Sequence, residues 1–302
     1  MNRALQPGSA ASPRSDPPPA AAADRGGESA AYGGEFVMSD AEFTRITAKV
    51  FEIAGIVLKD HKRQMVYTRL SRRLRATGLT AFGAYMDLIE RPEGKAEMVQ
   101  FTNAVTTNLT SFFREGHHFT HLREQVLEPL AKGGKTRLRV WSAGCSTGEE
   151  PYSIAMTARA AARSLASVDF RILATDLDTN VLATGKAGVY PEARAADIPA
   201  ELRSGALARN GDRVEFSSQV KSMIAFRKLN LLHPWPFRGP FDAIFCRNVL
   251  IYFDAETKAG LVRRYAEALT DDGVLYLGHS ESLLGEHPLL RSEGRTIYRR
   301  RK

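Results

Sequence analysis

The feature that most constrains this fold is an alternation of short apolar runs with amphipathic helices after about Arg137. The apolar runs are LRVWSA, FRILATD, FDAIFCR and GVLYLG, and the helical patterns begin near Glu149, Thr179 and Ala255. Near-continuous apolar strands separated by helices are typical of a parallel sheet that is covered on both faces. The sequence therefore predicts a doubly wound α/β domain.

An insertion interrupts this alternation at about residues 190–229, where the sequence is polar and contains glycine. Residues 214–217 and 224–229 have the composition of strands. We therefore predict a small β subdomain that includes both segments.

The preceding segment, from Ser39 to about Val105, has a helical pattern instead. Phe43, Ile46 and Val50 recur at three- and four-residue spacing, and glycines then divide the segment into several short helices. Ser39 or Asp40 is placed to cap the first helix. The resulting domain boundaries are an all-helical domain at 36–105 and the α/β domain at 106–302.

Residues 1–35 consist mostly of Pro, Ala, Gly and Ser, which predicts a disordered tail. Prolines and charges break every candidate signal sequence, and no apolar run is long enough to span a bilayer, so a cytoplasmic protein without membrane insertion is expected. The formal net charge of +8 indicates an acidic partner, which could be nucleic acid, a membrane surface or a carboxylate-rich protein.

The loop after the first strand, GCSTGEEP at 144–151, opens a helix where an α/β sheet usually binds its ligand. Glu149 and Glu150 in the first helical turn suit the helix dipole but would repel the phosphates of a dinucleotide. The loop therefore fits a nucleoside without phosphates, for which S-adenosylmethionine is the obvious candidate. Asp176, at the end of the second strand, can accept hydrogen bonds from ribose hydroxyls. Each acidic residue alone could be an ordinary helix-start or N-cap residue, but their joint order favours a ligand site.

Five stretches together resemble the CheR family of chemotaxis protein-glutamate O-methyltransferases. They are NLTSFFRE at 108–115, VWSAGCSTGEEPYSIAM at 140–156, ATDLDTNVL at 174–182, FDAIFCRNVLIYF at 241–253 and GHSESL at 278–283. The resemblance implies a helical domain followed by a Rossmann-like S-adenosylmethionine-dependent methyltransferase domain with a small β subdomain. The stretch at 207–213 is shorter than in members that bind a receptor's C-terminal pentapeptide, so the resemblance does not carry that tether over.

The resemblance also implies the site residues. The cofactor contacts would be Asn108, Thr110, Arg114, Glu150, Asp176, Asn230, Leu231, Arg247 and Asn248. Arg114 and Tyr252 would lie nearest the transferred methyl group and orient the substrate carboxylate. Since a glutamate with an ordinary pKa of about 4.3 is already ionised near neutral pH, no general base and no metal are needed. The product would be S-adenosylhomocysteine.

The basic stretch KDHKRQMVYTRLSRRLR at 59–75 is read as a helix with a cationic face. Lys62, Arg69 and Arg73 share that face and Arg72 lies beside it. An isolated charged face is often merely solvated. The resemblance implies that it docks on the glutamate-rich helical bundle of a methyl-accepting chemotaxis receptor, and that the enzyme is a monomer recruited to membrane receptor arrays.

No metal site or disulfide is predicted. Cys145 and Cys246 are far apart and form no paired ligand motif, and the cluster His117, His118 and His121 lacks the remaining residues of known zinc motifs.

Two other functions stay open at this stage. One is a nucleic-acid methyltransferase, although CRNVLIY at 246–252 lacks an Asn/Asp-Pro-Pro-aromatic sequence and no basic, aromatic-rich stretch offers a stacking surface, so no nucleic acid is expected. The other is a sensor module that binds S-adenosylmethionine without catalysis, against which the presence of Arg114, Asp176 and Tyr252 speaks.

Overall fold

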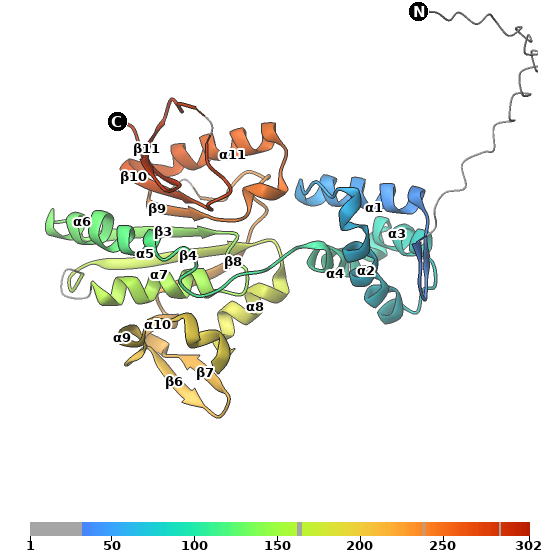
Figure 1. Cartoon of the computed structure of the whole chain (residues 1–302), viewed down its shortest axis with the longest axis horizontal. Helices are drawn as coiled ribbons and strands as arrows, with labels where there is room; N and C mark the ends of the chain where they lie inside the picture. Colours follow the sequence, from blue (N-terminus) through green and yellow to red (C-terminus); the bar gives the residue numbers. More distant parts are fainter. Residues whose placement is uncertain (1–31, 162–164, 238, 284) are drawn as a thin grey trace, which may run out of the picture.

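The computed structural model describes residues 32–161, 165–237, 239–283 and 285–302. A helical domain stands beside a larger α/β domain, from which a small sheet projects (Figure 1). Most of the predicted tail lies outside the described residues, but its end forms β1 (Tyr32–Gly33), which pairs antiparallel with β2 (Val37–Met38). In these described ranges, no helix is long and apolar enough to cross a membrane.

The helical domain extends from α1 to α4. Its elements are α1 (Asp40–Ala54), η1 (Asp60–Lys62), α2 (Arg63–Thr77), α3 (Phe82–Glu90), η2 (Pro92–Gly94) and α4 (Lys95–Val105). Ser39 is the N-cap of α1, and its side chain and that of Glu42 each accept a hydrogen bond from the other's backbone N–H. The apolar face of α1, including Ile46 and Val50, is buried against α2, α3 and α4.

The α/β domain begins with α5 (His117–His121), the π-helical segment η3 (Leu122–Leu127) and α6 (Glu128–Lys132). The elements of the main sheet and the helices around it follow in order. They are β3 (Arg137–Ala143), α7 (Glu149–Ala160), β4 (Asp169–Asp176), α8 (Thr179–Ala187), β8 (Ile224–Lys228), β9 (Phe241–Cys246), η5 (Leu250–Tyr252), α11 (Ala255–Ala268), β10 (Leu269–Leu277), β11 (Leu290–Gly294) and β12 (Ile297–Arg300).

These strands form a seven-stranded sheet in the order β11-β12-β10-β9-β3-β4-β8. The five strands from β8 to β10 are parallel, as predicted, whereas β12 runs antiparallel to both β10 and β11. The expectation of a parallel sheet is therefore correct for the centre and wrong for one edge, where a C-terminal hairpin completes the sheet.

Both faces of the sheet are covered, because neighbouring residues of one strand enter different cores. Val140 and Phe245 pack in one core with Tyr152 of α7, while Trp141 and Ile244 pack in the other. The second core includes residues of α11. This alternation is the two-residue period of a strand, and burial on both faces explains why the central strands β3 and β9 are mostly apolar.

The β subdomain contains a separate three-stranded sheet below the main one (Figure 1). Its elements are β5 (Val189–Pro191), η4 (Glu192–Asp197), α9 (Ala200–Arg203), β6 (Leu207–Asn210) and β7 (Arg213–Phe216), and α10 (Ser218–Lys221) leads back to the main sheet. The predicted strand at 214–217 is confirmed as β7 with a shift of one residue. The assignment of 224–229 to the subdomain is wrong, because β8 pairs with β4 at the edge of the main sheet.

Candidate functional site

One cavity of about 280 Å³ lies at the carboxyl ends of β3, β4 and β9. Its walls also include the end of α1, the segment at 106–111 that links the two domains, the segment at 229–231, and η5. Carboxyl ends of parallel strands are where open α/β sheets bind ligands. The helical domain therefore closes one side of the site.

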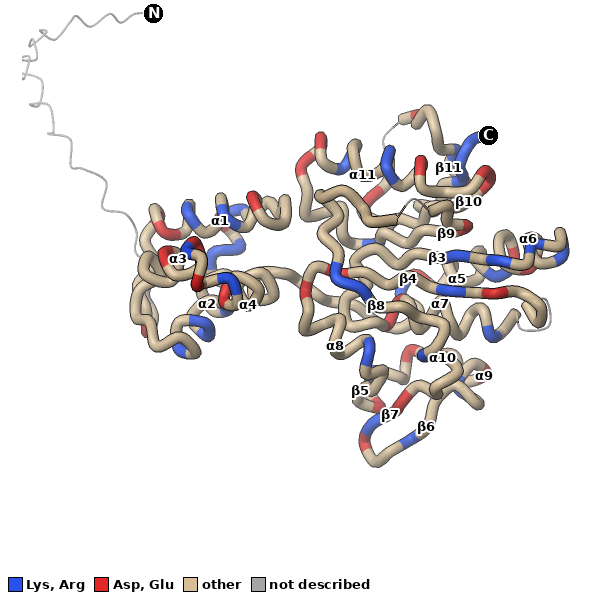
Figure 2. Tube along the Cα trace, turned by 180° about the vertical axis from the view of Figure 1, so that it is seen from behind, with Lys and Arg blue, Asp and Glu red and all other residues tan. Residues whose placement is uncertain are grey.

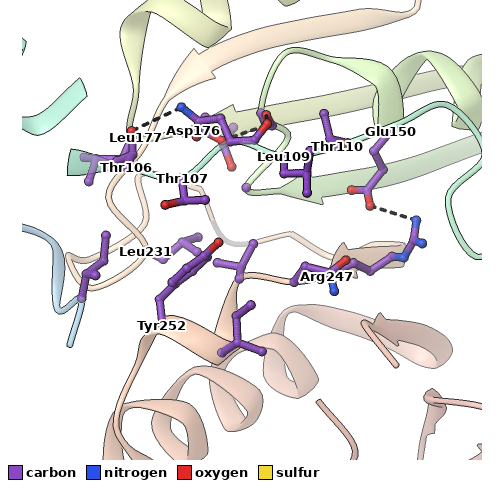
Figure 3. Close-up of a pocket in the computed structure, with 18 of the residues that line it drawn as sticks. Thr106, Thr107, Leu109, Thr110, Glu150, Asp176, Leu177, Leu231, Arg247 and Tyr252 are labelled. Atoms are coloured by element: carbon purple, nitrogen blue, oxygen red, sulfur yellow. Dashed lines mark hydrogen bonds and ion pairs between the residues drawn. The ribbon is translucent and has the colours of Figure 1, made fainter. Parts of the chain in front are cut away.

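All the residues predicted for cofactor binding or catalysis line this cavity, although they come from five separate parts of the sequence. They are Asn108, Thr110, Arg114, Glu150, Asp176, Asn230, Leu231, Arg247, Asn248 and Tyr252. Figure 3 shows several of them, together with Thr106, Thr107, Leu109 and Leu177, around the same space.

Asp176 ends β4, and backbone N–H groups hold its carboxylate. Ser146 N donates to Oδ2 at 2.8 Å and Asp178 N donates to Oδ1 at 3.0 Å. Burial nevertheless raises the pKa of Asp176 to about 6. The alternative reading of Asp176 as an N-cap is wrong, because Asp178 caps α8. Asp176 is therefore available to a ligand.

The segment that links the domains is anchored by side chains of the α/β domain. Asn108 Nδ2 donates to Asp178 Oδ2 at 2.8 Å, and Ser146 Oγ donates to the Asn108 carbonyl at 2.8 Å. Phe113 N donates to Ser153 Oγ at 2.9 Å. The side chain of Asn108 thus positions the wall of the cavity.

Glu150 and Arg247 form an ion pair at the side of the cavity (Figure 3). Arg247 Nη1 lies 3.2 Å from Glu150 Oε2, and Ser142 Oγ donates to Oε1 at 2.7 Å. Arg247 also lies 3.6 Å from Glu115 and donates to the carbonyl of Arg114. Burial raises the pKa of Glu150 even though Arg247 opposes that shift.

Arg114 and Tyr252 both line the cavity, from segments that are far apart in the sequence. Arg114 Nη1 donates to the Leu109 carbonyl at 3.2 Å, and the backbone carbonyl of Tyr252 accepts from Val57 N at 2.9 Å. Burial raises the pKa of Tyr252, while Thr107 and the nearby Arg114 act to lower it. The Tyr252 hydroxyl therefore stays protonated near neutral pH and can donate a hydrogen bond.

Asn230, Leu231 and Asn248 complete the lining. The Asn230 amide joins the domains, since Nδ2 donates to the Ile53 carbonyl at 2.8 Å. Asn248 has a positive φ of 59°, and its N–H donates to Glu281 Oε2 at 2.7 Å. Glu281 thereby fixes the turn that carries Asn248.

Residues 41–106 match the family model described as the all-alpha domain of CheR methyltransferase, and residues 108–298 match its SAM binding domain. The chain belongs to the CheR methyltransferase family. It is 43% identical to a chemotaxis protein methyltransferase of Salmonella typhimurium, over 86% of this chain and 90% of that protein.

Two further relatives of this CheR methyltransferase have similar coverage. A chemotaxis protein methyltransferase of Escherichia coli is 43% identical over 86% of this chain and 91% of that protein. A probable chemotaxis protein methyltransferase of Rhizobium etli is 42% identical over 78% of this chain and 91% of that protein.

The cavity suits S-adenosylmethionine, as family membership implies. The Asp176 carboxylate can accept hydrogen bonds from ribose hydroxyls, and Leu177, Leu229 and Leu231 provide apolar surface for the adenine ring. The turn at Gly144 must lack a side chain, because its φ is 83° and a Cβ there would lie 2.4 Å from Val249 Cγ2.

We expect cofactor affinity to fall at acid pH through Asp176. With a pKa of about 6 in the free protein, the group is ionised at neutral pH and becomes protonated below that value. Hydroxyl donors favour the ionised acceptor, so the Kd should be constant above about pH 7 and rise by up to roughly tenfold per unit below pH 6. Calorimetric titration of S-adenosylmethionine checks this. Asp176→Asn should raise the Kd at neutral pH and make it nearly independent of pH. An unchanged pH dependence of the Kd in this variant would contradict the attribution to Asp176.

The predicted docking residues are not equally exposed. Arg69 Nη1 donates to the Thr106 carbonyl at 2.5 Å, and Arg73 pairs with Glu97 at 2.7 Å. Lys62 lies in η1, before α2, and it is exposed, as is Arg72. Basic and acidic residues are interspersed over the helical domain (Figure 2). The four residues therefore do not form one free cationic face, and docking by this region would depend on Lys62 and Arg72.

The histidine cluster has structural contacts. His121 Nδ1 is hydrogen-bonded to the Tyr276 hydroxyl at 2.9 Å, and His118 Nε2 lies 3.1 Å from the Arg295 carbonyl. Burial lowers the pKa of His118 to about 3, so the ring is neutral. In the described part of the chain, no group of three or more His, Cys, Asp or Glu side chains could hold a metal ion.

Sequence reasoning missed several supporting residues of the site. Glu281 lies in the quoted GHSESL motif and Glu115 ends NLTSFFRE, so each motif carried a signal that was left without a role. Asp178 precedes the helix that begins at Thr179, a position typical of an N-cap.

Proposed function

We propose that this chain transfers a methyl group from S-adenosylmethionine to glutamate side-chain carboxylates of chemotaxis receptors. The products would be a glutamate methyl ester and S-adenosylhomocysteine. The observation that carries the proposal is the position of Arg114 and Tyr252, a cation and a protonated hydroxyl, on the cavity that Asp176 and Glu150 also line. The names of the relatives support a role in chemotaxis.

The residues of the site suffice for this chemistry. S-adenosylmethionine supplies a methyl group already activated by its sulfonium. A receptor glutamate has an ordinary pKa of about 4.3 and is ionised near neutral pH, so it needs no general base. Arg114 and Tyr252 would hold the carboxylate by charge-assisted hydrogen bonds, and the cavity wall would exclude water from it.

We expect Lys62 and Arg72 to bring the acidic receptor to the site. A double charge reversal, Lys62→Glu with Arg72→Glu, should raise the KM for receptor by roughly tenfold at low ionic strength, and less in high salt. The cofactor Kd should not change. Lys132→Glu with Lys302→Glu reverses two exposed charges elsewhere and is the matched control. Equal KM values for the two double variants would show that Lys62 and Arg72 do not dock the receptor.

The proposed function is tested by methyl transfer. Labelled S-adenosylmethionine is incubated with the protein and with membranes that contain chemoreceptors, and base then hydrolyses any ester formed. Release of labelled methanol from receptor glutamates is the expected result. Cofactor binding without receptor labelling would contradict the proposal, and labelling of nucleic acid or no transfer at all would then separate the two alternatives.

A further inference from the structure

Arg194 connects the β subdomain to the cavity wall. It lies in η4, and its Nη2 donates to the Thr110 carbonyl at 2.9 Å. The same Nη2 lies 2.8 Å from Glu149 Oε1. Thr110 lines the cavity, whereas Arg194 itself belongs to the inserted subdomain. One guanidinium therefore joins the subdomain, the segment between the domains, and the start of α7.

The Glu149 carboxylate makes this contact more than a surface ion pair. The Glu149 side chain is 0% exposed, while that of Arg194 is 41% exposed. The other carboxylate oxygen of Glu149, Oε2, accepts a hydrogen bond from Thr147 Oγ1 at 2.6 Å. A buried carboxylate requires a counter-charge or several donors, so the position of Arg194 is tied to the first turn of α7.

A second contact fixes the subdomain against the same loop. The Tyr190 hydroxyl, from β5, donates to the Thr147 carbonyl at 2.7 Å. Gly148 makes this approach possible, because a Cβ there would lie 2.8 Å from the Tyr190 hydroxyl. Because Tyr190 fixes the subdomain against this loop, the backbone that carries Arg194 is fixed as well, and its guanidinium can position the Thr110 carbonyl.

We infer that Arg194 is a positioning residue for cofactor binding, so that the β subdomain takes part in forming the S-adenosylmethionine site. By holding the Thr110 carbonyl, Arg194 fixes the segment at 108–111 as one wall of the cavity. This inference rests on the proposed function only in its use of S-adenosylmethionine. It does not depend on which substrate receives the methyl group.

The test is the Kd for S-adenosylmethionine, measured by calorimetry on the full chain. Arg194→Ala should raise the Kd by about tenfold, since a charge-assisted hydrogen bond that orders the wall is lost. Arg194→Lys keeps the positive charge and should recover part of the affinity. Arg209→Ala is the matched control, because Arg209 belongs to the same subdomain and pairs with Glu192. Its Kd should stay within about twofold of the unaltered protein.

A second variant separates positioning from folding. Arg194→Ala leaves the buried Glu149 carboxylate without its cation and could unfold the start of α7. The double variant Arg194→Ala with Glu149→Gln removes that buried charge, but the Thr110 carbonyl still lacks its hydrogen bond from Arg194. We expect it to restore the melting temperature but not the affinity, while the KM for receptor at saturating cofactor stays unchanged.

The outcomes distinguish this inference from the proposed function. A double variant with unaltered cofactor affinity would overturn the positioning role, whatever the substrate is. If neither alanine variant folded, unaltered affinity in Arg194→Lys and Arg194→Gln would overturn it as well. Normal cofactor binding by the unaltered protein without receptor methylation would instead refute the proposed function and leave the role of Arg194 intact.

Discussion

The double variant Arg114→Ala with Tyr252→Phe should lose methyl transfer by at least about a hundredfold, because it removes both groups that orient the substrate carboxylate. Each side chain lines the cavity, and burial keeps Tyr252 protonated and able to donate. The loss should appear in kcat measured at saturating receptor and cofactor. Cofactor affinity should fall much less, since Asp176 and Glu150 remain in place.

The single variants apportion this effect. Tyr252→Phe removes only a hydroxyl, so it isolates the hydrogen bond from the shape of the site. Arg123→Ala, which removes an exposed guanidinium outside the cavity, is the control and should leave kcat unchanged. Unchanged turnover in a double variant that still binds cofactor would refute the catalytic role of both residues.

The fold could largely be predicted from the sequence, because its signals are local. The apolar runs that became β3, β4, β9 and β10 are buried on both faces, and Ser39 with Glu42 marks the start of α1. The assignment of β8 failed for a physical reason. β8 is an edge strand and most of its residues are exposed, so its sequence resembles that of a strand in a small surface sheet. Only its pairing with β4 shows that it belongs to the main sheet.

The sequence indicated which residues lie at the candidate site, but not the hydrogen bonds and ion pairs that position them. The ten residues that the resemblance implied for cofactor binding and catalysis all line one cavity, since motifs record which residues meet at strand ends. The resemblance could not show that Arg69 donates to the Thr106 carbonyl instead of facing a partner. Nor could it show that Arg194 reaches Thr110 across 84 positions of the sequence. Such contacts depend on how separate elements pack, which spacing along the chain does not encode.

Arg247→Ala should be the most destabilising single substitution among those considered, by about 3–5 kcal/mol of unfolding free energy. The Arg247 side chain is 2% exposed and lies between Glu115 and Glu150, which are 12% and 11% exposed. It also packs over the Phe119 ring, 5.5 Å from its centroid. Its removal leaves two poorly solvated carboxylates without their shared cation.

The pH dependence of this loss gives a specific signature. Burial acts to raise the pKa of Glu115, but Arg247 and the His279 N–H outweigh it, so the pKa lies below its ordinary value of 4.5. A lowered pKa contributes stability that is present above 4.5 and is lost as the pH falls through the folded value. The alanine variant lacks this contribution. In the variant the pKa of Glu115 should rise, and that of Glu150, which burial already raises, should rise further. The deficit should therefore be largest near neutral pH and shrink as the pH falls and both carboxylates take up protons.

Denaturant titrations at neutral and acid pH measure both effects. Arg123→Ala is the control, because Arg123 pairs with Glu124 at 2.6 Å and both side chains are exposed, by 40% and 46%. Its loss should cost only about 1 kcal/mol. A deficit for Arg247→Ala that matched this control, or that did not shrink in acid, would mean that Glu115 and Glu150 find other partners. Arg247 would then contribute packing contacts to the cavity wall, and it would not be needed to neutralise Glu115 and Glu150.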